Sequence, residues 1–237
     1  MSKIILFVFE GVKTEAHIYN SLRKYFLSEN DHSIICATFN TVIYKLYKDL
    51  QKYDELELKF DLIEELRPNN TGVLDGIVRK NIAEIYLIFD YDGHASNASD
   101  EKLTEMLEYF NNETENGKLY ISYPMIEAIK HLKSDIPFHE TTAEAKQKTS
   151  YKERVSHECN ECYKNFWQWD HQHWAVIIQE HCRKLNFITT GHYTFPNQTF
   201  EQSEIFEAQL EKYINPDNKV AVLSAFPVLL LDYYGAT

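Results

Sequence analysis

The sequence has few of the residues that mark several common classes of protein. Its four cysteines, in 237 residues, are too few and too unevenly spaced for a disulfide framework. Seven glycines and six prolines leave little room for long loops. The apolar stretch near residue 5 and the longer run at 220–231 are both too short for a signal peptide or a membrane span. We therefore expect a cytoplasmic protein in a reducing environment, with no part in a membrane.

Positive charge is also scarce. The 24 Lys and Arg residues stand against 36 Asp and Glu residues, which gives a net charge of −12. Non-specific binding to nucleic acid depends on Lys and Arg side chains that neutralise phosphates, so bulk electrostatics alone cannot hold DNA or RNA here. Action on nucleic acid would need a local basic strip, bridging metal ions or a partner. What the chain does have is 44% hydrophobic residues, which is enough for a sizeable core.

Apolar runs alternate with amphipathic segments over the first part of the chain. Short continuous apolar runs predict buried strands at 3–9, 32–39, 82–89 and 118–124. Apolar residues at helical spacing predict helices at 13–27, 41–53, 60–67 and 99–113. This alternation is typical of an α/β fold with a mostly parallel sheet flanked by helices.

The second part of the chain has a different pattern. Residues 139–150 are polar and predict an exposed linker or loop. Beyond it, residues 150–187 read as one continuous helix and residues 203–214 as another. We expect an α/β domain over 1–135 and a mainly helical C-terminal extension over 136–237.

Acidic residues follow the predicted strands. Glu10 ends the first strand, Asp90 and Asp92 end the third, and Glu127 lies just past the fourth. Ligands of open α/β sheets gather beyond the carboxyl ends of the strands, and Mg²⁺ prefers oxygen ligands. We expect Asp90 and Asp92 to bind Mg²⁺, with Gly93 letting the two carboxylates converge, and Glu10 to act as a further ligand or as the base for an attacking water.

Other residues near these acids have two readings each. Glu15 and Glu127 are candidates to hold a second ion for in-line displacement, but Glu15 also suits a cap in the first turn of a helix, and Glu127 also suits a plain helix start. His94 is a candidate proton shuttle or phosphate contact, although its position favours an ordinary loop residue. Position alone suggests three catalytic cations: Lys13, Lys130 and Lys133.

The order and placement of these motifs resemble the TOPRIM domain of topoisomerases, bacterial primases and several nucleases. That family has a Glu after its first strand and Asp-x-Asp after its third, here Glu10 and the pair Asp90 and Asp92. "FEGVKTEAHIY" (9–19) looks closest to the opening motif of the RloB-like and OLD nuclease branches, and "YPMIEAIKHL" (123–132) is similar to their Pro-x-x-Glu. The resemblance covers about residues 3–133.

The resemblance implies a metal-dependent endonuclease that uses Mg²⁺, for which Mn²⁺ can substitute. Its substrate would be DNA or RNA, tRNA included. It further implies the effector of a bacterial anti-phage system, acting beside a separately encoded ATPase.

Two other functions fit parts of the same sequence. "IFDYDGH" also looks like the nucleophile motif of haloacid dehalogenase-type phosphatases, in which Asp90 would attack phosphorus and Asp92 would be the acid/base. Against this, the motif follows the third strand and His94 replaces the usual Thr. The second alternative is a regulatory or docking subunit without catalysis. Binding of a divalent ion by the carboxylates would argue for catalysis, because buried like charges are costly without a counter-ion.

The cysteines raise the question of zinc. Cys159 and Cys162 have C-x-x-C spacing, and further candidate ligands are His157, His171, His173 and Cys182. Zinc sites of this kind place the C-x-x-C pair on a turn, whereas this segment reads as continuous helix. The sequence therefore favours two half-buried helical cysteines over a zinc site.

Aromatic and apolar residues are abundant late in the chain. They are Phe195, Phe200, Phe206 and the run 220–234. Some of them must be core, and either all of them pack on the sheet or a neighbouring helix or a surplus is left at the surface. Such a composition is typical of the centre of a protein interface. We expect a homo-oligomer or a docked partner, such as the ATPase, that brings the nucleic acid to the acids.

Overall fold

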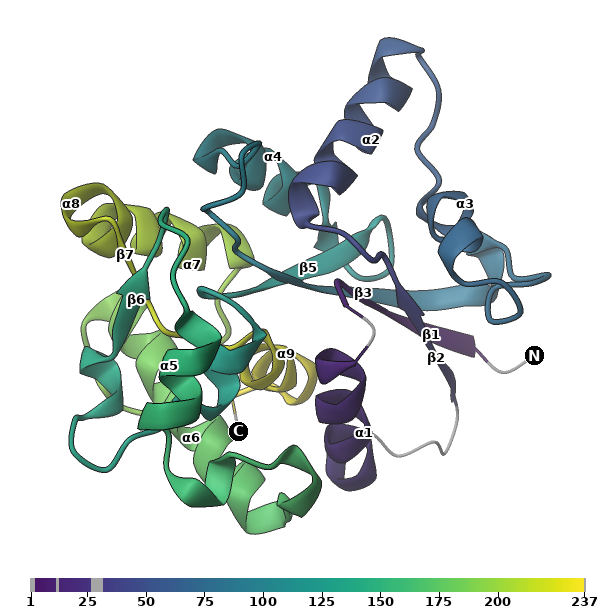
Figure 1. The fold of residues 1–237 in the computed structure, drawn as a ribbon. Coiled ribbons are helices and arrows are strands. Elements are labelled where there is room, and N and C mark those ends of the chain that lie inside the picture. Colours follow the sequence, from purple (N-terminus) through teal and green to yellow (C-terminus); the bar gives the residue numbers. More distant parts are fainter. Residues whose placement is uncertain (1–2, 12, 27–31, 237) are drawn as a thin grey trace. The chain divides into compact units, whose positions relative to one another are not determined.

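The computed structural model describes residues 3–11, 13–26 and 32–236, and Figure 1 shows its elements. The chain divides into two compact units. The first unit comprises the described residues of Met1–Phe89 and Ser99–Leu119, and the second those of Asp90–Ala98 and Tyr120–Thr237. Each unit is described below by itself. No helix in the described ranges is long and apolar enough to cross a membrane.

A five-stranded sheet has the order β2-β1-β3-β5-β4. Its strands are β1 (Lys3–Phe9), β2 (His32–Thr38), β3 (Ile82–Asp90), β4 (Asn111–Asn112) and β5 (Gly117–Ser122). β1 pairs in parallel with β2 and with β3, and β4 pairs antiparallel with β5. The predicted α/β fold with a mainly parallel sheet flanked by helices is therefore confirmed.

Helices cover both faces of β1, which explains why this strand is a continuous apolar run. The helices of the first unit are α1 (Thr14–Phe26), α2 (Ile43–Glu55), α3 (Leu62–Leu66) and α4 (Asp100–Tyr109). Phe7 of β1 faces α1, with its ring centroid 5.0 Å from that of Tyr19. Figure 1 shows α1 on one side of the sheet and α2, α3 and α4 on the other. All four predicted helices of this part are present, and Pro68 follows the end of α3.

The register of β1 and β3 fixes where the first acidic residue lies. Phe9 is opposite Ile88, and the backbone N–H of Glu10 donates to the carbonyl of Ile88 at 3.2 Å. Because these strands are parallel, Glu10 follows β1 at the same edge of the sheet at which β3 ends in Asp90.

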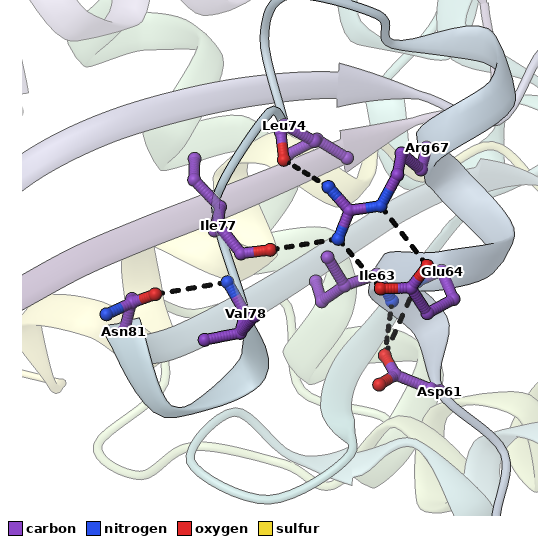
Figure 2. A network of polar contacts seen from close by, with 8 residues as sticks. All are labelled: Asp61, Ile63, Glu64, Arg67, Leu74, Ile77, Val78 and Asn81. Carbon is purple, nitrogen blue, oxygen red and sulfur yellow. Dashed lines mark hydrogen bonds and ion pairs between the residues drawn. The ribbon is translucent and has the colours of Figure 1, made fainter.

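An arginine closes the long connection between α3 and β3 (Figure 2). The guanidinium of Arg67 donates to the carbonyls of Leu74 at 2.5 Å and Ile77 at 3.0 Å. It also forms two hydrogen bonds with Glu64, the shorter of them 2.7 Å long. Asp61 caps α3 by accepting from the backbone N–H of Ile63. The planar guanidinium of Arg67 thus joins three parts of a connection that has no strands or long helices.

The second unit is built mainly from helices. Its helices and turns are η3 (Ile126–Lys130), η4 (Phe138–Glu140), α5 (Tyr151–Glu158), η5 (Glu161–Tyr163), η6 (Phe166–Gln168), α6 (His171–Thr190), α7 (Gln202–Gln209), η7 (Leu210–Ile214), α8 (Asn215–Asp217) and α9 (Ala225–Tyr234). Two short strands, β6 (Thr142–Glu144) and β7 (Lys219–Ala221), form an antiparallel pair. The domain boundary predicted at 135/136 stays a prediction.

The predicted continuous helix over 150–187 is wrong. Helix α5 ends at Glu158 and α6 begins at His171, with two short turns between them. Asp170 causes the second start, because its carboxylate accepts from the backbone N–H groups of Gln172 and His173 as an N-cap. The predicted exposed linker is also wrong in part: β6 pairs with β7 inside it, and Ala143 is buried.

The apolar residues near the end of the chain are core rather than surface. Residues 220–231 are all buried, and so are Phe200 and Phe206. Residues 220–231 form most of β7 and of α9, and α9 is apolar on all its faces. Of the aromatics expected at an interface, Phe195, Tyr233 and Tyr234 are exposed. The predicted interface therefore loses most of its residues to the core.

Candidate functional site

The acidic residues that the sequence singles out fall in both units. Glu10 and Glu15 belong to the first unit, and Asp90, Asp92 and Glu127 to the second. Their surroundings are given unit by unit.

In the first unit, Glu10 and Glu15 line one cavity. Its volume is about 340 Å³, and Asn40 also contributes to its wall. The carboxylate of Glu15 accepts from the backbone N–H of Gly11 at 3.0 Å. Glu15 therefore ties down the turn before its own helix and also lines the cavity, while its helix-dipole role and its metal role both stay predictions.

The backbone around Glu10 is held on two sides. Its N–H donates to Ile88 of β3, and its carbonyl accepts from the N–H of Asn40 at 2.9 Å. The residue just past β1 is thereby fixed between the two strands that flank β1, and the side chain of Glu10 starts from a rigid backbone.

In the second unit, Asp90 and Asp92 stand on either side of a fully buried Tyr91. The N–H of Tyr91 donates to the carbonyl of Ser122 at 3.0 Å, and the Tyr91 ring lies 5.8 Å from that of Tyr123. Asp90 is itself only 8% exposed. The aromatic anchor explains how two acids can be held at the end of a strand rather than in a loose loop.

The turn after Asp90 differs from the one the sequence predicts. The left-handed residue is Asp92, with φ of +44°, and Gly93 is outside the left-handed region. Gly93 is required for a different reason: a Cβ there would lie 2.4 Å from Cε1 of Tyr91 and 2.7 Å from the carbonyl oxygen of Ala145. Aspartate is one of the few residues that adopt this conformation at modest cost. The left-handed backbone of Asp92 therefore sets the direction in which its side chain leaves the turn.

The side chain of Asp92 is only 14% exposed to solvent. Burial raises the pKa of its carboxyl, and His94, whose Nδ1 is 3.9 Å from Oδ1 of Asp92, acts in the opposite direction. Both side chains line a small cavity of about 30 Å³, to which Glu144 and Tyr151 also contribute. A cavity of this size holds about one water molecule.

Glu127 lies in η3 with its carboxylate almost entirely buried. Nζ of Lys152, in the first turn of α5, is 3.1 Å from Oε1 of Glu127. Lys152 has no signal in the sequence, because an ion pair that joins positions 25 residues apart depends on the fold alone.

A second group missed from the sequence adjoins Glu127. Nδ1 of His131 is 2.9 Å from the hydroxyl of Tyr151, and its Nε2 is 3.1 Å from Glu158. Burial lowers the pKa of His131 to about 4, so the ring is neutral near pH 7. Nδ1 then accepts from the Tyr151 hydroxyl, and the Nε2–H donates to Glu158. Burial also raises the pKa of Tyr151, with Glu127 and Asp90 adding to this effect.

Glu158 gathers the cations of this region. Partial burial would raise the pKa of Glu158, but hydrogen bonds from Lys133, His131 and Arg154 outweigh it and hold that pKa at about 2. Lys133, a candidate catalytic cation by position, thus has a structural partner in Glu158. Lys130 lies over the Phe166 ring at 5.0 Å, and Lys13 is exposed.

The fit of these residues to Mg²⁺ depends on donor chemistry. Within the described ranges, no three His, Cys, Asp or Glu side chains are grouped so as to enclose a metal ion. Mg²⁺ usually takes only one or two protein carboxylates and completes its shell with water and substrate phosphate. Asp90 and Asp92, on either side of the buried Tyr91, supply that number of carboxylates.

The surroundings of Cys159 and Cys162 differ from the predicted ones. The two cysteines are not in a continuous helix: Cys159 ends α5, and Cys162 lies in the turn η5. The helix argument against zinc is therefore wrong. Two other observations oppose a zinc site: burial raises the pKa of the Cys159 thiol, and Nδ1 of His173 lies 2.6 Å from Asp170.

Comparison with known proteins adds no family or relative: no protein-family model, no curated protein and no solved structure matches the chain.

Proposed function

We propose that this chain is a Mg²⁺-dependent nuclease that hydrolyses phosphodiester bonds of DNA or RNA, with a TOPRIM-like α/β domain and a helical C-terminal extension. One observation carries the proposal. Glu10 and Asp90 follow or end two neighbouring parallel strands, β1 and β3, at the carboxyl edge of the sheet, and Asp92 comes two residues later. This edge is where open α/β sheets bind their ligands.

The roles follow from the surroundings of each acid. Asp90 and Asp92 are the proposed ligands of Mg²⁺, which when bound supplies charge neutralisation at the phosphate and a more acidic water. Glu10 is a ligand or the base that takes the proton of the attacking water, and Glu127 is a second candidate for that base. Asp90 is 8% exposed and the Asp92 side chain 14% exposed, and a bound divalent cation would stabilise carboxylates with so little contact with water.

The nuclease would depend on a partner for its substrate. At a net charge of −12 the chain has no general attraction for a polyanion. We infer that a second copy or a separately encoded ATPase delivers the nucleic acid, in a setting of anti-phage defence. Exposed aromatic residues, among them Trp167 with 70% of its surface accessible, support such an interface.

The test is cleavage of plasmid, single-stranded DNA and tRNA by the purified chain in Mg²⁺, Mn²⁺ or EDTA. Asp90→Asn and Asp92→Asn should each lower the rate at least about 100-fold, the scale of losing a catalytic group. Asp92→Asn should also stabilise the metal-free chain, because burial disfavours the charged form of this carboxyl. Glu108→Gln, which removes an exposed acid on α4, is the matched control and should cleave normally.

Three other results would each change the assignment. Normal cleavage by both variants would mean that the acids are misassigned. Hydrolysis of p-nitrophenyl phosphate without cleavage of nucleic acid would favour the phosphatase that uses Asp90 as nucleophile. No hydrolysis of either, together with no binding of a divalent ion, would leave a docking subunit.

A further inference from the structure

Glu127 is a buried acid whose counter-ion comes from the surface. Its side chain is 3% exposed, whereas that of Lys152, 3.1 Å away, is 69% exposed. In the described part of the chain, Lys152 is the one charged group within ion-pair distance of Glu127. A carboxylate offers about four acceptor positions on its two oxygens, so one ammonium leaves much of its capacity unused.

The helix that carries Lys152 is anchored independently of this ion pair. Tyr151, the preceding residue, is buried and bound through its hydroxyl to His131. Arg154, two residues later, binds Glu158 at 3.0 Å and the carbonyl of Thr142. The Lys152 ammonium can therefore leave Glu127 by rotation of its flexible side chain, without any movement of α5.

The energetics favour exchange of this counter-ion. Leaving a buried carboxylate unpaired is costly, so the cation-free chain needs Lys152 in place. An ion pair with an exposed lysine is nevertheless weak, because the long side chain loses entropy and water screens the charge. A divalent cation has twice the charge and prefers carboxylate oxygens, so it can compete for the same group.

We propose that Lys152 is an exchangeable internal counter-ion: it neutralises Glu127 in the cation-free chain and leaves when a divalent cation binds there. The choice of Mg²⁺ or Mn²⁺ as that cation rests on the proposed nuclease function. The exchange would make the chain stable without metal and would raise the concentration of metal needed to load it.

Thermal unfolding in EDTA tests whether Lys152 neutralises Glu127 in the cation-free chain. Lys152→Met and Lys152→Gln should lower the unfolding midpoint, because both leave Glu127 buried without a cation. Lys148→Met is the matched control, since Lys148 is an exposed neighbour that makes no ion pair in the described ranges. In a Glu127→Gln background, Lys152→Met should have no effect. An equal loss of stability in both backgrounds would overturn the pairing.

Titration with Mn²⁺, monitored by electron paramagnetic resonance, tests whether Lys152 competes with a divalent cation for Glu127. Lys152→Met should bind Mn²⁺ about three- to tenfold more tightly than the native chain, the scale of one surface ion pair. Glu127→Gln should remove this gain. Equal affinities, or no binding by either form, would overturn the exchange.

The two proposals fail separately. Cleavage that depends on Asp90, with Mn²⁺ affinity unchanged in Lys152→Met, would keep the nuclease and remove the exchange. Tighter Mn²⁺ binding by Lys152→Met, with no cleavage of any nucleic acid, would keep the exchange and remove the nuclease.

Discussion

At the residue scale, the turn from Asp90 to His94 concentrates unfavourable local features where the chemistry is proposed. Asp92 combines a left-handed backbone with a side chain that is only 14% exposed, and Gly93 is in closer contact than any side chain could tolerate. Left-handed backbone costs a non-glycine residue on the order of 1 kcal/mol, and such costs cluster at functional sites. The close contacts of Gly93 are with the ring of the buried Tyr91 and with the carbonyl oxygen of Ala145.

The first prediction concerns Gly93. Gly93→Ala should lower the free energy of unfolding by about 1–3 kcal/mol, because its Cβ must displace both a buried ring and a backbone carbonyl. The measurement is urea unfolding in EDTA. Gly72→Ala is the control: its φ is +83° but nothing lies near its added Cβ, so it should show only the cost of the backbone conformation. Equal losses for the two variants would show that the close contact at Gly93 contributes nothing.

At the element scale, Arg67 and Asn70 hold the connection over 67–81 through their side chains, and Asn70 does so by binding the carbonyls of Thr38 and Leu66. Arg67 holds two carbonyls of the loop and the carboxylate of Glu64 at the same time (Figure 2). Lysine keeps the charge but lacks the planar fork, so it cannot reproduce these contacts together.

We therefore expect Arg67→Lys to speed amide hydrogen exchange in residues 73–78 while exchange in β1 stays slow. Glu64→Gln is the matched control, since it removes the ion pair and leaves both carbonyl contacts in place. Its effect on the loop should be smaller. If Glu64→Gln loosens the loop as much as Arg67→Lys, the ion pair rather than the carbonyl contacts holds the connection.

The elements that could be predicted from sequence are those with local signals. β1 and β3 are continuous apolar runs, and α4 has Ser99 as a cap that accepts from Lys102. The β6–β7 pair has no such signal, because two three-residue strands meet across more than 70 residues of chain. The break before α6 did have one, the N-cap Asp170, but the helical spacing of the surrounding aromatics concealed it.

The acids of the candidate site were named from their positions after strands, yet their surroundings were not predictable. Sequence order suggests that Asp90 and Asp92 follow β3, but only the packing of Tyr91 and Ala145 shows why Asp92 takes the left-handed conformation. The partners of Glu127 and His131, namely Lys152, Tyr151 and Glu158, lie 20 to 27 residues away in sequence and have no motif. Contacts of this kind depend on tertiary packing.

At the scale of the whole molecule, several basic side chains of the second unit are buried, and burial favours the neutral form of each. His181 accepts from the N–H of Ser224 at Nδ1 and lies 3.3 Å from the carbonyl of Ile129 at Nε2, which fits the neutral ring with its proton on Nε2. Burial lowers the pKa of His181 to about 3. Burial likewise lowers the pKa of Lys184, whose Nζ donates to the carbonyls of Phe138 and Thr141. Each of these groups binds a proton more readily in the unfolded chain.

The last prediction is acid lability that begins well above the range of the carboxyl groups. The pKa values of His131 and His181 are about 4 and 3 in the folded chain, against 6.5 when unfolded. The unfolded chain therefore binds more protons below pH 6.5. The stability that the two neutral histidines contribute is complete above that pH and falls as the pH drops toward 4, by up to about 1.4 kcal/mol per pH unit for each histidine.

Glu158 does not contribute to this window, because a pKa held at about 2 loses its stabilisation only below pH 4.5. Urea unfolding at pH 7.5, 6.0 and 5.0 should show the decline. His181→Gln keeps a donor and an acceptor without the titration, and should remove roughly half of the slope that the two histidines cause. His131→Gln provides the same test at the other position. Equal unfolding free energies of the native chain at pH 7.5 and 5.0 would contradict the buried neutral rings.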